Sequence, residues 1–551
     1  MATTGILRSR RSAGQLHALA SVEREIRAND PAGGRKYLRD FRDAYRSYQH
    51  VLAAADVPAR IAPADIVLVG DYHALPNSQR YLASLIQHAA IRQRPVVLGV
   101  ETIFSRDQHI VDEWFRGEID EAELRQRIRF ELDWGYDWTP FYELLSAARE
   151  HTDAIYGLDC MPREDLRKIG ARDRHAADKI VEIHGRHPGA LVLVLFGESH
   201  LAPKHMPSLL RERLPEARLL TLLQNVDPLY WRAAGESADC VEAVQVSEDV
   251  LCVFNATPLE KYENYRLCLD RWGRSDRSVP DLGPTVYNLI DGLVSFLGIN
   301  RYSPHNTTQP RLLVDAMPEV YSRSSDALLR RLLSRKGFTA SQRRAMLRQV
   351  KERGSAYLAP LNAVYVRQFR MMFSAEDATR FLHHACRGLP NRVNGKAPAP
   401  RAPEDAFYAT VFEHALAFFG SRVLYPARPA FRDADLAELS DLTREDLEQQ
   451  TSLSFPEAAD ALDFLAAHRE FECTRPHSRL APERLTQAFA FTGRKYEYVS
   501  EKLGYLAGND LYDAYLEGRL TPAALRRLFL THVEEPGVVR ETYFQLLNGR
   551  R

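Results

Sequence analysis

The sequence lacks long hydrophobic runs, an excess of either charge and a cysteine framework. Its longest apolar stretches, such as 191–196, fall far short of the roughly 20 residues that cross a bilayer, so we expect no membrane span. The 551 residues include 73 basic and 73 acidic side chains, a balance that offers no global attraction for nucleic acid or an anionic membrane. With 45% hydrophobic and 26% charged residues, the composition is that of a folded globular protein.

The cysteines and the N-terminal segment predict a cytoplasmic protein. The six cysteines are scattered without CxxC spacing, which is typical of reduced thiols and not of disulfides or a zinc knuckle. Residues 12–24 contain no apolar segment of the length that a secretory signal needs. The first cysteine, Cys160, lies too far along the chain to carry an N-terminal lipid anchor.

The apolar runs predict an α/β domain with a mostly parallel sheet flanked by helices. A strand that is buried on both faces requires a run that is apolar at every position, without alternation. Six such runs alternate with helical stretches, at 66–69, 96–100, 154–158, 191–196, 219–223 and 250–254. We place this domain at residues 61–270.

Helical patterns flank the predicted sheet. A helical arm is expected at residues 1–60, with a second helical run from Tyr37 to Ala55. Mainly α-helical regions are expected at 271–388 and 404–551, separated by a proline-rich loop or linker at 389–403. The C-terminal helices are predicted from a 3.6-residue periodicity at 324–333, 340–353, 375–386, 405–419 and 458–468.

Imidazole and carboxylate groups follow four consecutive apolar runs. Ligands of an open parallel sheet bind at the carboxyl ends of its strands, so these positions are where chemistry is expected. Such groups on rigid supports can bind a divalent cation or act as general acid and base. The runs are followed in turn by Gly70-Asp71-Tyr72-His73, Glu101, Asp159 and Gly197-Glu198-Ser199-His200.

Two of these groups have the form GxxH. Chance alone gives about one such match in a chain with 29 glycines and 18 histidines, and this chain has three. The copies at His73 and His200 directly follow apolar runs, whereas the copy at His17 lies in a helical region. A tight turn with a locally packed histidine is the structural alternative for each copy, and the shared context favours a site for the pair.

These motifs, in this order, resemble the ChaN-like proteins of the Tiki superfamily, which includes TraB/PrgY-like and erythromycin-esterase-like proteins. The resemblance covers residues of about 60–260 and rests on VLVGDYH, LGVETI, DWGYDWTPFYELLSAARE, ARDRHAADKI and LFGESH. Asp71 stands where the family has glutamate, and the chain lacks the export signal of family lipoproteins that take up haem. The resemblance implies a site with His73 and His200 as paired histidines, Glu101 as carboxylate and Arg172 as arginine.

Two functions are predicted from this set. In the first, His73, Glu101 and His200 either bind Mn, Co, Fe or Zn or act directly as base and acid, with Arg172 stabilising an oxyanion. The protein is then a hydrolase of an amide or ester bond in a small-molecule or peptide substrate. In the second, the protein binds haem or iron without enzymatic activity. Tyr72 or a histidine is then the axial ligand, with Asp71 and Glu198 nearby. Trp134 and Trp138 are candidates to pack on the macrocycle, although aromatic residues at helical spacing more often belong to the core.

Other sites are less favoured by the sequence. GxSxG and Walker-type motifs are absent, which argues against a nucleophile elbow and a P-loop. His383-His384 and Glu413-His414 suggest a helical metal site, but the Glu-x-x-His spacing of such bundles is missing. The basic residues at 330–344 show no aromatic stacking pattern, and the chain has an equal acidic count, so we expect a solvated face and no nucleic-acid partner. The sequence gives no basis for predicting an oligomeric state.

Overall fold

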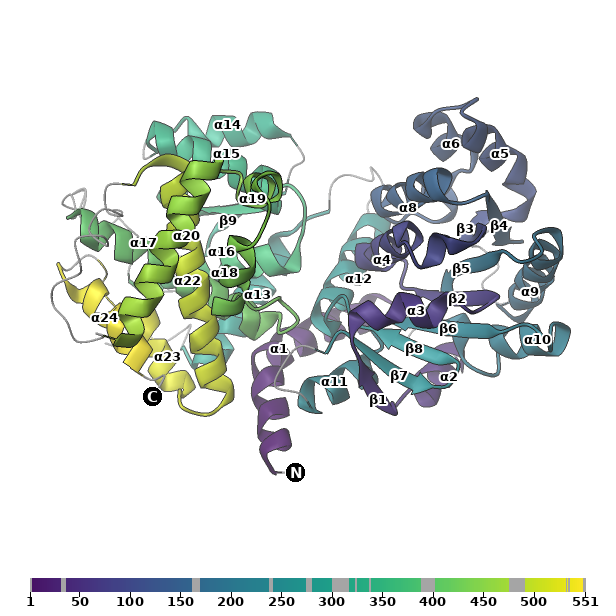
Figure 1. The fold of residues 1–551 in the computed structure, drawn as a ribbon, viewed down its shortest axis with the longest axis horizontal. Helices are drawn as coiled ribbons and strands as arrows, with labels where there is room; N and C mark the ends of the chain where they lie inside the picture. The colour runs from purple at the N-terminus through teal and green to yellow at the C-terminus, as the bar shows by residue number, and fades with distance from the viewer. Residues whose placement is uncertain are drawn as a thin grey trace. The chain divides into compact units, whose positions relative to one another are not determined.

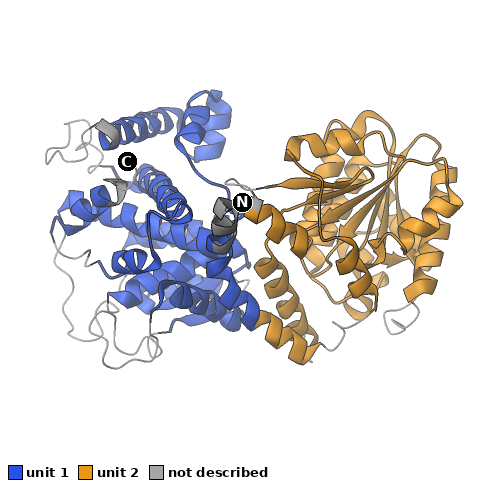
Figure 2. Cartoon of the chain, turned by 90° about the horizontal axis from the view of Figure 1, so that it is seen from below, with its two compact units in different colours: residues 1–21, 281–551 blue, residues 22–280 orange. Residues whose placement is uncertain are grey.

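The chain forms two compact units. Unit 2 comprises residues 22–280, and unit 1 comprises residues 1–21 together with 281–551 (Figure 2). Within the described part of the chain, every helix is too short or too polar to cross a bilayer. This computed structural model describes residues 2–30, 36–160, 169–236, 241–273, 280–299, 317–322, 325–335, 338–387, 402–474, 491–531, 533 and 536–548.

Unit 2 is an α/β domain with an eight-stranded, mostly parallel sheet, which confirms the predicted fold class (Figure 1). The strand order is β1-β7-β8-β6-β2-β5-β3-β4, and only the pairs that involve β7 are antiparallel. All six predicted runs are strands. The strands are β1 (His50–Leu52), β2 (Ile66–Asp71), β3 (Val96–Phe104), β4 (Ala154–Asp159), β5 (Leu191–Gly197), β6 (Leu219–Gln224), β7 (Ala243–Ser247) and β8 (Val250–Val253).

Helices cover both faces of this sheet, so its central strands are buried on both sides. One face carries α3 (Val57–Ile61), α4 (Pro76–Gln87), α5 (Gln108–Arg116) and α8 (Trp138–His151). The other carries α2 (Lys36–Ala44), α9 (Ile169–Arg186), α10 (Met206–Arg213) and α11 (Asp227–Glu236). In β2, Val67 and Val69 pack in the first core and Ile66 and Leu68 in the second, which is why the run is apolar throughout. The unit also contains α6 (Glu121–Arg127), α7 (Phe130–Asp133) and α12 (Pro258–Gly273).

The predicted helix from Tyr37 to Ala55 is wrong beyond Ala44. The helix α2 ends at Ala44, and His50–Leu52 forms the edge strand β1, which pairs antiparallel with β7. Of the three residues in β1, only Leu52 is buried. Their conformation is set by backbone pairing with residues almost 200 positions away, a tertiary effect that overrides local pattern.

Unit 1 is mainly helical, as predicted, and also holds a three-stranded sheet in the order β10-β11-β9. These strands have four residues each, too few for a clear pattern: β9 (Glu319–Ser322), β10 (Ser355–Leu358) and β11 (Ala363–Val366). The predicted linker at 389–403 lies outside the described residues except for its last two. The helices are α13 (Gly283–Leu297), α14 (Asp326–Leu333), α15 (Ala340–Arg353), α16 (Met371–Cys386), α17 (Pro403–Leu424), α18 (Asp433–Ser440), α19 (Arg444–Thr451), α20 (Phe455–Thr474), α22 (Gly493–Leu516), α23 (Pro522–Phe529) and α24 (Val538–Asn548).

The first part of helix α1 (Ala2–Asn29) packs within unit 1, although its last residues belong to unit 2. Asn288 of α13 donates a hydrogen bond from Nδ2 to the carbonyl oxygen of Ala18 at 3.0 Å. Gly14 lies so close to Val423 of α17 that a Cβ atom there would stand 2.1 Å from a methyl carbon. Unit 1 is therefore assembled from the two ends of the described chain.

Candidate functional site

The carboxyl ends of four neighbouring strands, β2, β5, β3 and β4, bring the predicted site residues together around Glu101. His73 follows β2, and its Nε2 lies 3.4 Å from Glu101 Oε2. His200 lies in the short 3-10 helix η6 (Glu198–Leu201) after β5, with its Nε2 4.0 Å from Glu101 Oε1. Arg172, from the first turn of α9, bonds Glu101 Oε1 at 2.5 Å. The other three predicted catalytic residues thus meet at the carboxylate of Glu101.

Both imidazoles are oriented by a second carboxylate. The Nδ1 of His73 lies 2.7 Å from Asp71 Oδ2, and the Nδ1 of His200 is hydrogen-bonded to Asp173 Oδ1. A carboxylate can only accept, so each Nδ1 carries the proton and each Nε2 is directed toward Glu101. The site is therefore a pair of carboxylate–histidine dyads that face a shared glutamate.

Glu101 is held on both of its oxygen atoms. Oε1 accepts from Arg172, and Oε2 accepts from the backbone N–H of Gly197 at 2.5 Å. Arg172 is itself fixed by two bonds to Asp159, at 3.0 and 2.7 Å. Bidentate pairs of this kind constrain geometry strongly. The predicted role of Arg172 at an oxyanion stays a prediction, and these bonds also make it a positioning residue for Glu101.

Burial and the charged groups of the site shift the pKa values of its side chains. Burial alone would lower the pKa of His73, but the carboxylates of Asp71 and Glu101 outweigh it and raise that pKa to about 10. Burial would raise the pKa of Glu101, whereas His73, Arg172 and His200 together hold it well below its usual range. Burial raises the pKa of Asp159, against the opposing effect of Arg172. Glu101 is thus kept ionised between two imidazoles.

Gly197, the glycine of the second GxxH motif, lies close to the side chains of the site. A Cβ atom there would lie 3.0 Å from Glu101 Oε2 and 3.5 Å from His73 Nε2. At Gly70 the nearest atom would be 3.6 Å away, which is ordinary contact. The second motif therefore needs glycine so that the side chains of Glu101 and His73 can lie this close to its backbone, whereas the first motif does not.

For the hydrolase predicted from the sequence, Gly197→Ala is expected to lower kcat by about 10-fold or more, because displacement of catalytic groups by fractions of an ångström is costly. Gly70→Ala, the matched control, is expected to stay within about twofold of the wild type. Steady-state kinetics of both variants test this, with melting curves to show that each is folded. Equal losses in the two variants would contradict the argument.

Tyr72 and Glu198 lie beside a lysine that the sequence did not point to. Lys261 of α12 donates to both oxygens of Glu198, at 3.0 and 3.1 Å, and its Nζ lies 4.5 Å from the centre of the Tyr72 ring. Burial raises the pKa of Glu198 against the opposing charge of Lys261. Glu198 and Lys261 thus form an ion pair next to the dyads, and neither they nor Tyr72 bond Glu101. Asp71, in contrast, belongs to the His73 dyad.

The two tryptophans expected at a macrocycle lie in different places. Trp134 is buried with its ring centre 5.5 Å from that of His73, so it borders the site. Trp138 is buried against Phe130 and donates from Nε1 to Glu121 at 2.8 Å. Trp138 is therefore a core residue, which is the interpretation that its helical spacing favoured, and its contact with a ligand is not supported.

Further polar partners complete the dyads. Gln79 of α4 donates to Asp71 Oδ1, and Tyr37 of α2 donates from its hydroxyl to Asp173 Oδ2 at 3.0 Å. The Tyr37 ring also stacks on His205, with centres 3.8 Å apart. Asp159 and Asp173 carried a sequence signal, since one ends a strand and the other adjoins Arg172. Tyr37 and Gln79 carried none, because they come from helices outside the strand ends.

The expected divalent metal finds no support in this arrangement. Both oxygens of Glu101 are already engaged by Arg172 and Gly197, and the guanidinium charge 2.5 Å away would repel a cation. Among the residues with described placement, no group of three or more His, Cys, Asp or Glu side chains is set to hold a metal ion. This includes the α16–α17 pair, where His384 lies 3.4 Å from Glu413 but His414 bonds Arg380 instead.

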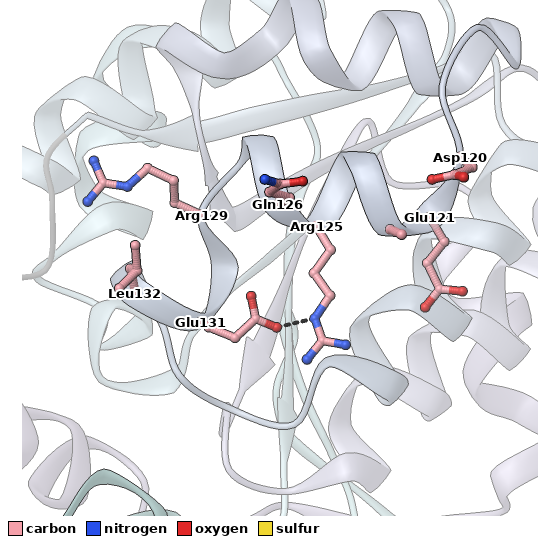
Figure 3. Close-up of a pocket in the computed structure, with 8 residues that line it drawn as sticks. Asp120, Glu121, Arg125, Gln126, Arg129, Glu131 and Leu132 are labelled. Atoms are coloured by element: carbon pink, nitrogen blue, oxygen red, sulfur yellow. Dashed lines mark hydrogen bonds and ion pairs between the residues drawn. The ribbon is translucent and has the colours of Figure 1, made fainter. Parts of the chain in front are cut away.

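A pocket of about 580 Å³ lies elsewhere in unit 2, at α6 and α7 (Figure 3). Five of its eight lining residues are charged, and Arg125 and Glu131 pair with each other. None of the predicted site residues lines it. Its lining residues are Asp120, Glu121, Ala122, Arg125, Gln126, Arg129, Glu131 and Leu132.

The fold and the paired dyads define an α/β domain with a polar site at the strand carboxyl ends. Residues 57–174 match the family described as haem-binding uptake, Tiki superfamily, ChaN, which confirms the predicted resemblance over this segment. The match includes His73, Glu101 and Arg172 and ends before His200. A solved structure titled "Cofacial heme binding to ChaN of Campylobacter jejuni" is 16% identical, with 32% of this chain and 88% of that chain covered and a TM-score of 0.26. No curated protein matches the chain.

Proposed function

We propose that unit 2 hydrolyses an amide or ester bond by acid–base catalysis without a metal. The observation that carries this proposal is the pair of imidazoles, each with Nδ1 bound to a carboxylate and Nε2 directed toward Glu101. A carboxylate on Nδ1 fixes the tautomer and orientation that a catalytic histidine needs. Two such dyads provide both a proton acceptor and a proton donor.

The two histidines take different roles in this proposal. His200, oriented by Asp173, accepts a proton at Nε2 from a water molecule, whose oxygen attacks the carbonyl carbon. His73 faces the carboxylates of both Asp71 and Glu101, which stabilise its protonated form, so it donates a proton to the leaving oxygen or nitrogen. The bond to the leaving group breaks, and the products are a carboxylic acid and an alcohol or amine. Glu101, fixed by Arg172, keeps the two imidazole rings in position.

Haem binding is the second candidate, and the description of the matching family favours it. Both ring nitrogens of His73 face carboxylates, so Tyr72 is the better candidate for an axial ligand. Its ring is half-buried, and within the described part of the chain its hydroxyl makes no hydrogen bond. Burial raises the pKa of Tyr72 well above its usual value, which opposes formation of the tyrosinate that iron prefers. Bound haem would supply redox or ligand-carrying chemistry.

One set of measurements on the full chain separates these functions. We expect the purified protein to hydrolyse neutral esters or amides, to keep that activity after exhaustive chelation, and to lose it in the His73→Ala/His200→Ala double variant. Loss of activity on chelation, with recovery on addition of a divalent metal, would contradict the metal-free mechanism. A Soret band after haem addition that disappears in Tyr72→Phe, in a protein without hydrolytic activity, would favour haem binding instead.

A further inference from the structure

Four aromatic side chains form a series of ring contacts that begins at His73. Tyr136 lies 5.2 Å from His73 and 5.3 Å from Trp272, measured between ring centres. Trp272 lies 6.2 Å from Tyr265, which lies 5.9 Å from Tyr72, the residue before His73. We call Tyr72, Tyr136, Tyr265 and Trp272 the aromatic cluster. Its members come from three separate segments of unit 2, and Tyr136 joins them to His73.

The aromatic cluster differs from the core aromatic residues by its exposure. All four of its rings are half-buried. Trp134 and Phe141, which also contact His73, are buried at 5% and 2% exposure. Rings that serve only to fill a core are normally covered. Part of the cluster surface is therefore left for contact with a ligand beside His73.

The rings of the aromatic cluster are held in place by polar contacts. Trp272 donates from Nε1 to the carbonyl oxygen of Gly135 at 3.0 Å, and Tyr265 bonds Asp30 through its hydroxyl. Lys261 lies against the Tyr72 ring while it is paired with Glu198. Side chains that are fixed before binding lose little entropy when a ligand arrives. This is the condition for a preformed ring-binding surface.

The charges nearby argue for an uncharged ligand. Among the described residues, the buried or half-buried cationic groups at the site are Arg172, Lys261 and the protonated His73, and all three are already paired with carboxylates. None of them is placed to neutralise an additional anionic group on a substrate. A flat, neutral ring can stack on or pack edge-to-face with Tyr and Trp rings without such a partner.

We propose that the aromatic cluster binds a flat, uncharged ring of the substrate next to the bond that is cleaved. The proposal rests on the proposed hydrolytic function, since it places the ring beside His73. It names Trp272, Tyr265 and Tyr136 as residues that determine substrate specificity. The substrate class is therefore neutral esters or amides with an aromatic group close to the carbonyl.

The test compares hydrolysis of methyl phenylacetate and methyl hexanoate by the full-length protein. The wild type is expected to favour the phenylacetate by about fivefold or more in kcat/KM, the range that aromatic pairing gives. Trp272→Leu and Tyr136→Leu are each expected to reduce this ratio to about twofold or less. Trp231→Leu is the matched control, because Trp231 is a partly buried ring in the opposite core.

Calorimetry with phenylacetone and 2-heptanone tests ring binding independently of hydrolysis, because neither ketone can be hydrolysed. Tighter binding of phenylacetone that is lost in Trp272→Leu would support the ring site even if no ester were cleaved, and the proposed function would then fail alone. Ester hydrolysis with no preference for the ring, or a preference that both cluster variants retain, would overturn the ring site and leave the function standing. Melting curves identify a variant that fails to fold. If one of the two cluster variants does not fold, the substrate preference of the other variant decides whether the ring site stands.

Discussion

His200→Ala is expected to lower kcat for the hydrolysed ester by about 10²- to 10⁴-fold, the usual contribution of a positioned general base. The imidazole is buried, its Nδ1 is bound to Asp173 and its Nε2 is directed into the site, so no solvent group can take its place. Asp173→Asn is expected to cost on the order of 10²-fold, because the amide no longer fixes the required tautomer. Steady-state kinetics at saturating substrate measure both effects.

His187→Gln is the matched control for this experiment. His187 lies at the end of α9, before the amino end of β5, and its Nε2 lies 2.9 Å from the hydroxyl of Tyr156. It is therefore a hydrogen-bonded histidine of the same unit, but it lies at the amino end of a strand and not at the carboxyl ends where the site is. We expect its replacement to change kcat by less than about twofold. If His200→Ala kept its activity, or if His187→Gln lost as much, the assignment of the base would be wrong.

Glu376→Gln is expected to destabilise unit 1 by about 3–5 kcal/mol, because removal of one partner from a buried ion pair leaves uncompensated charge. Glu376 of α16 is 1% exposed and meets three guanidinium groups. Arg428 lies at 2.6 Å, Arg380 at 3.2 Å and Arg353 at 3.3 Å. These cations hold the pKa of Glu376 far below its usual range despite burial. The neutral amide would leave their charges in a buried environment.

Denaturant unfolding followed by circular dichroism measures this effect. Glu438→Gln on α18 is the control, since that side chain is exposed and its replacement is expected to change stability by less than about 0.5 kcal/mol. Two compact units can unfold separately, so the transition of unit 1 must be resolved before its free energy is compared. A change of less than about 1 kcal/mol in Glu376→Gln would show that solvent or rearranged carboxylates compensate the arginines.

The central sheet was predictable because its strands are buried on both faces and read as unbroken apolar runs. The edge strand β1 and its partner β7 were not, since they are short and partly polar. Gln245 of β7 pairs with His50 of β1, and no local apolar signal marks either residue. Edge strands depend on backbone pairing with a distant segment, which one sequence does not display.

The core of the site followed from one rule, that the carboxyl ends of parallel strands meet at the same edge. That rule located His73, Glu101 and His200, and the resemblance to the ChaN-like proteins located Arg172. It could not show that Arg172 and Gly197 occupy the oxygens of Glu101, which is what removes the support for a metal. Nor could it find Tyr37 or Lys261, which reach the site from helices far away in the sequence.

The distribution of unit 1 over both ends of the chain bears on the order of folding during synthesis. The first 21 residues leave the ribosome before unit 2, but their packing partners, such as Asn288 and Val423, are made only after it. Unit 2 can therefore complete its core before the residues that pack against the start of α1 have been synthesised. Truncation after residue 280 is expected to leave that segment with an uncovered apolar face, so separate expression of unit 2 should begin near Val22.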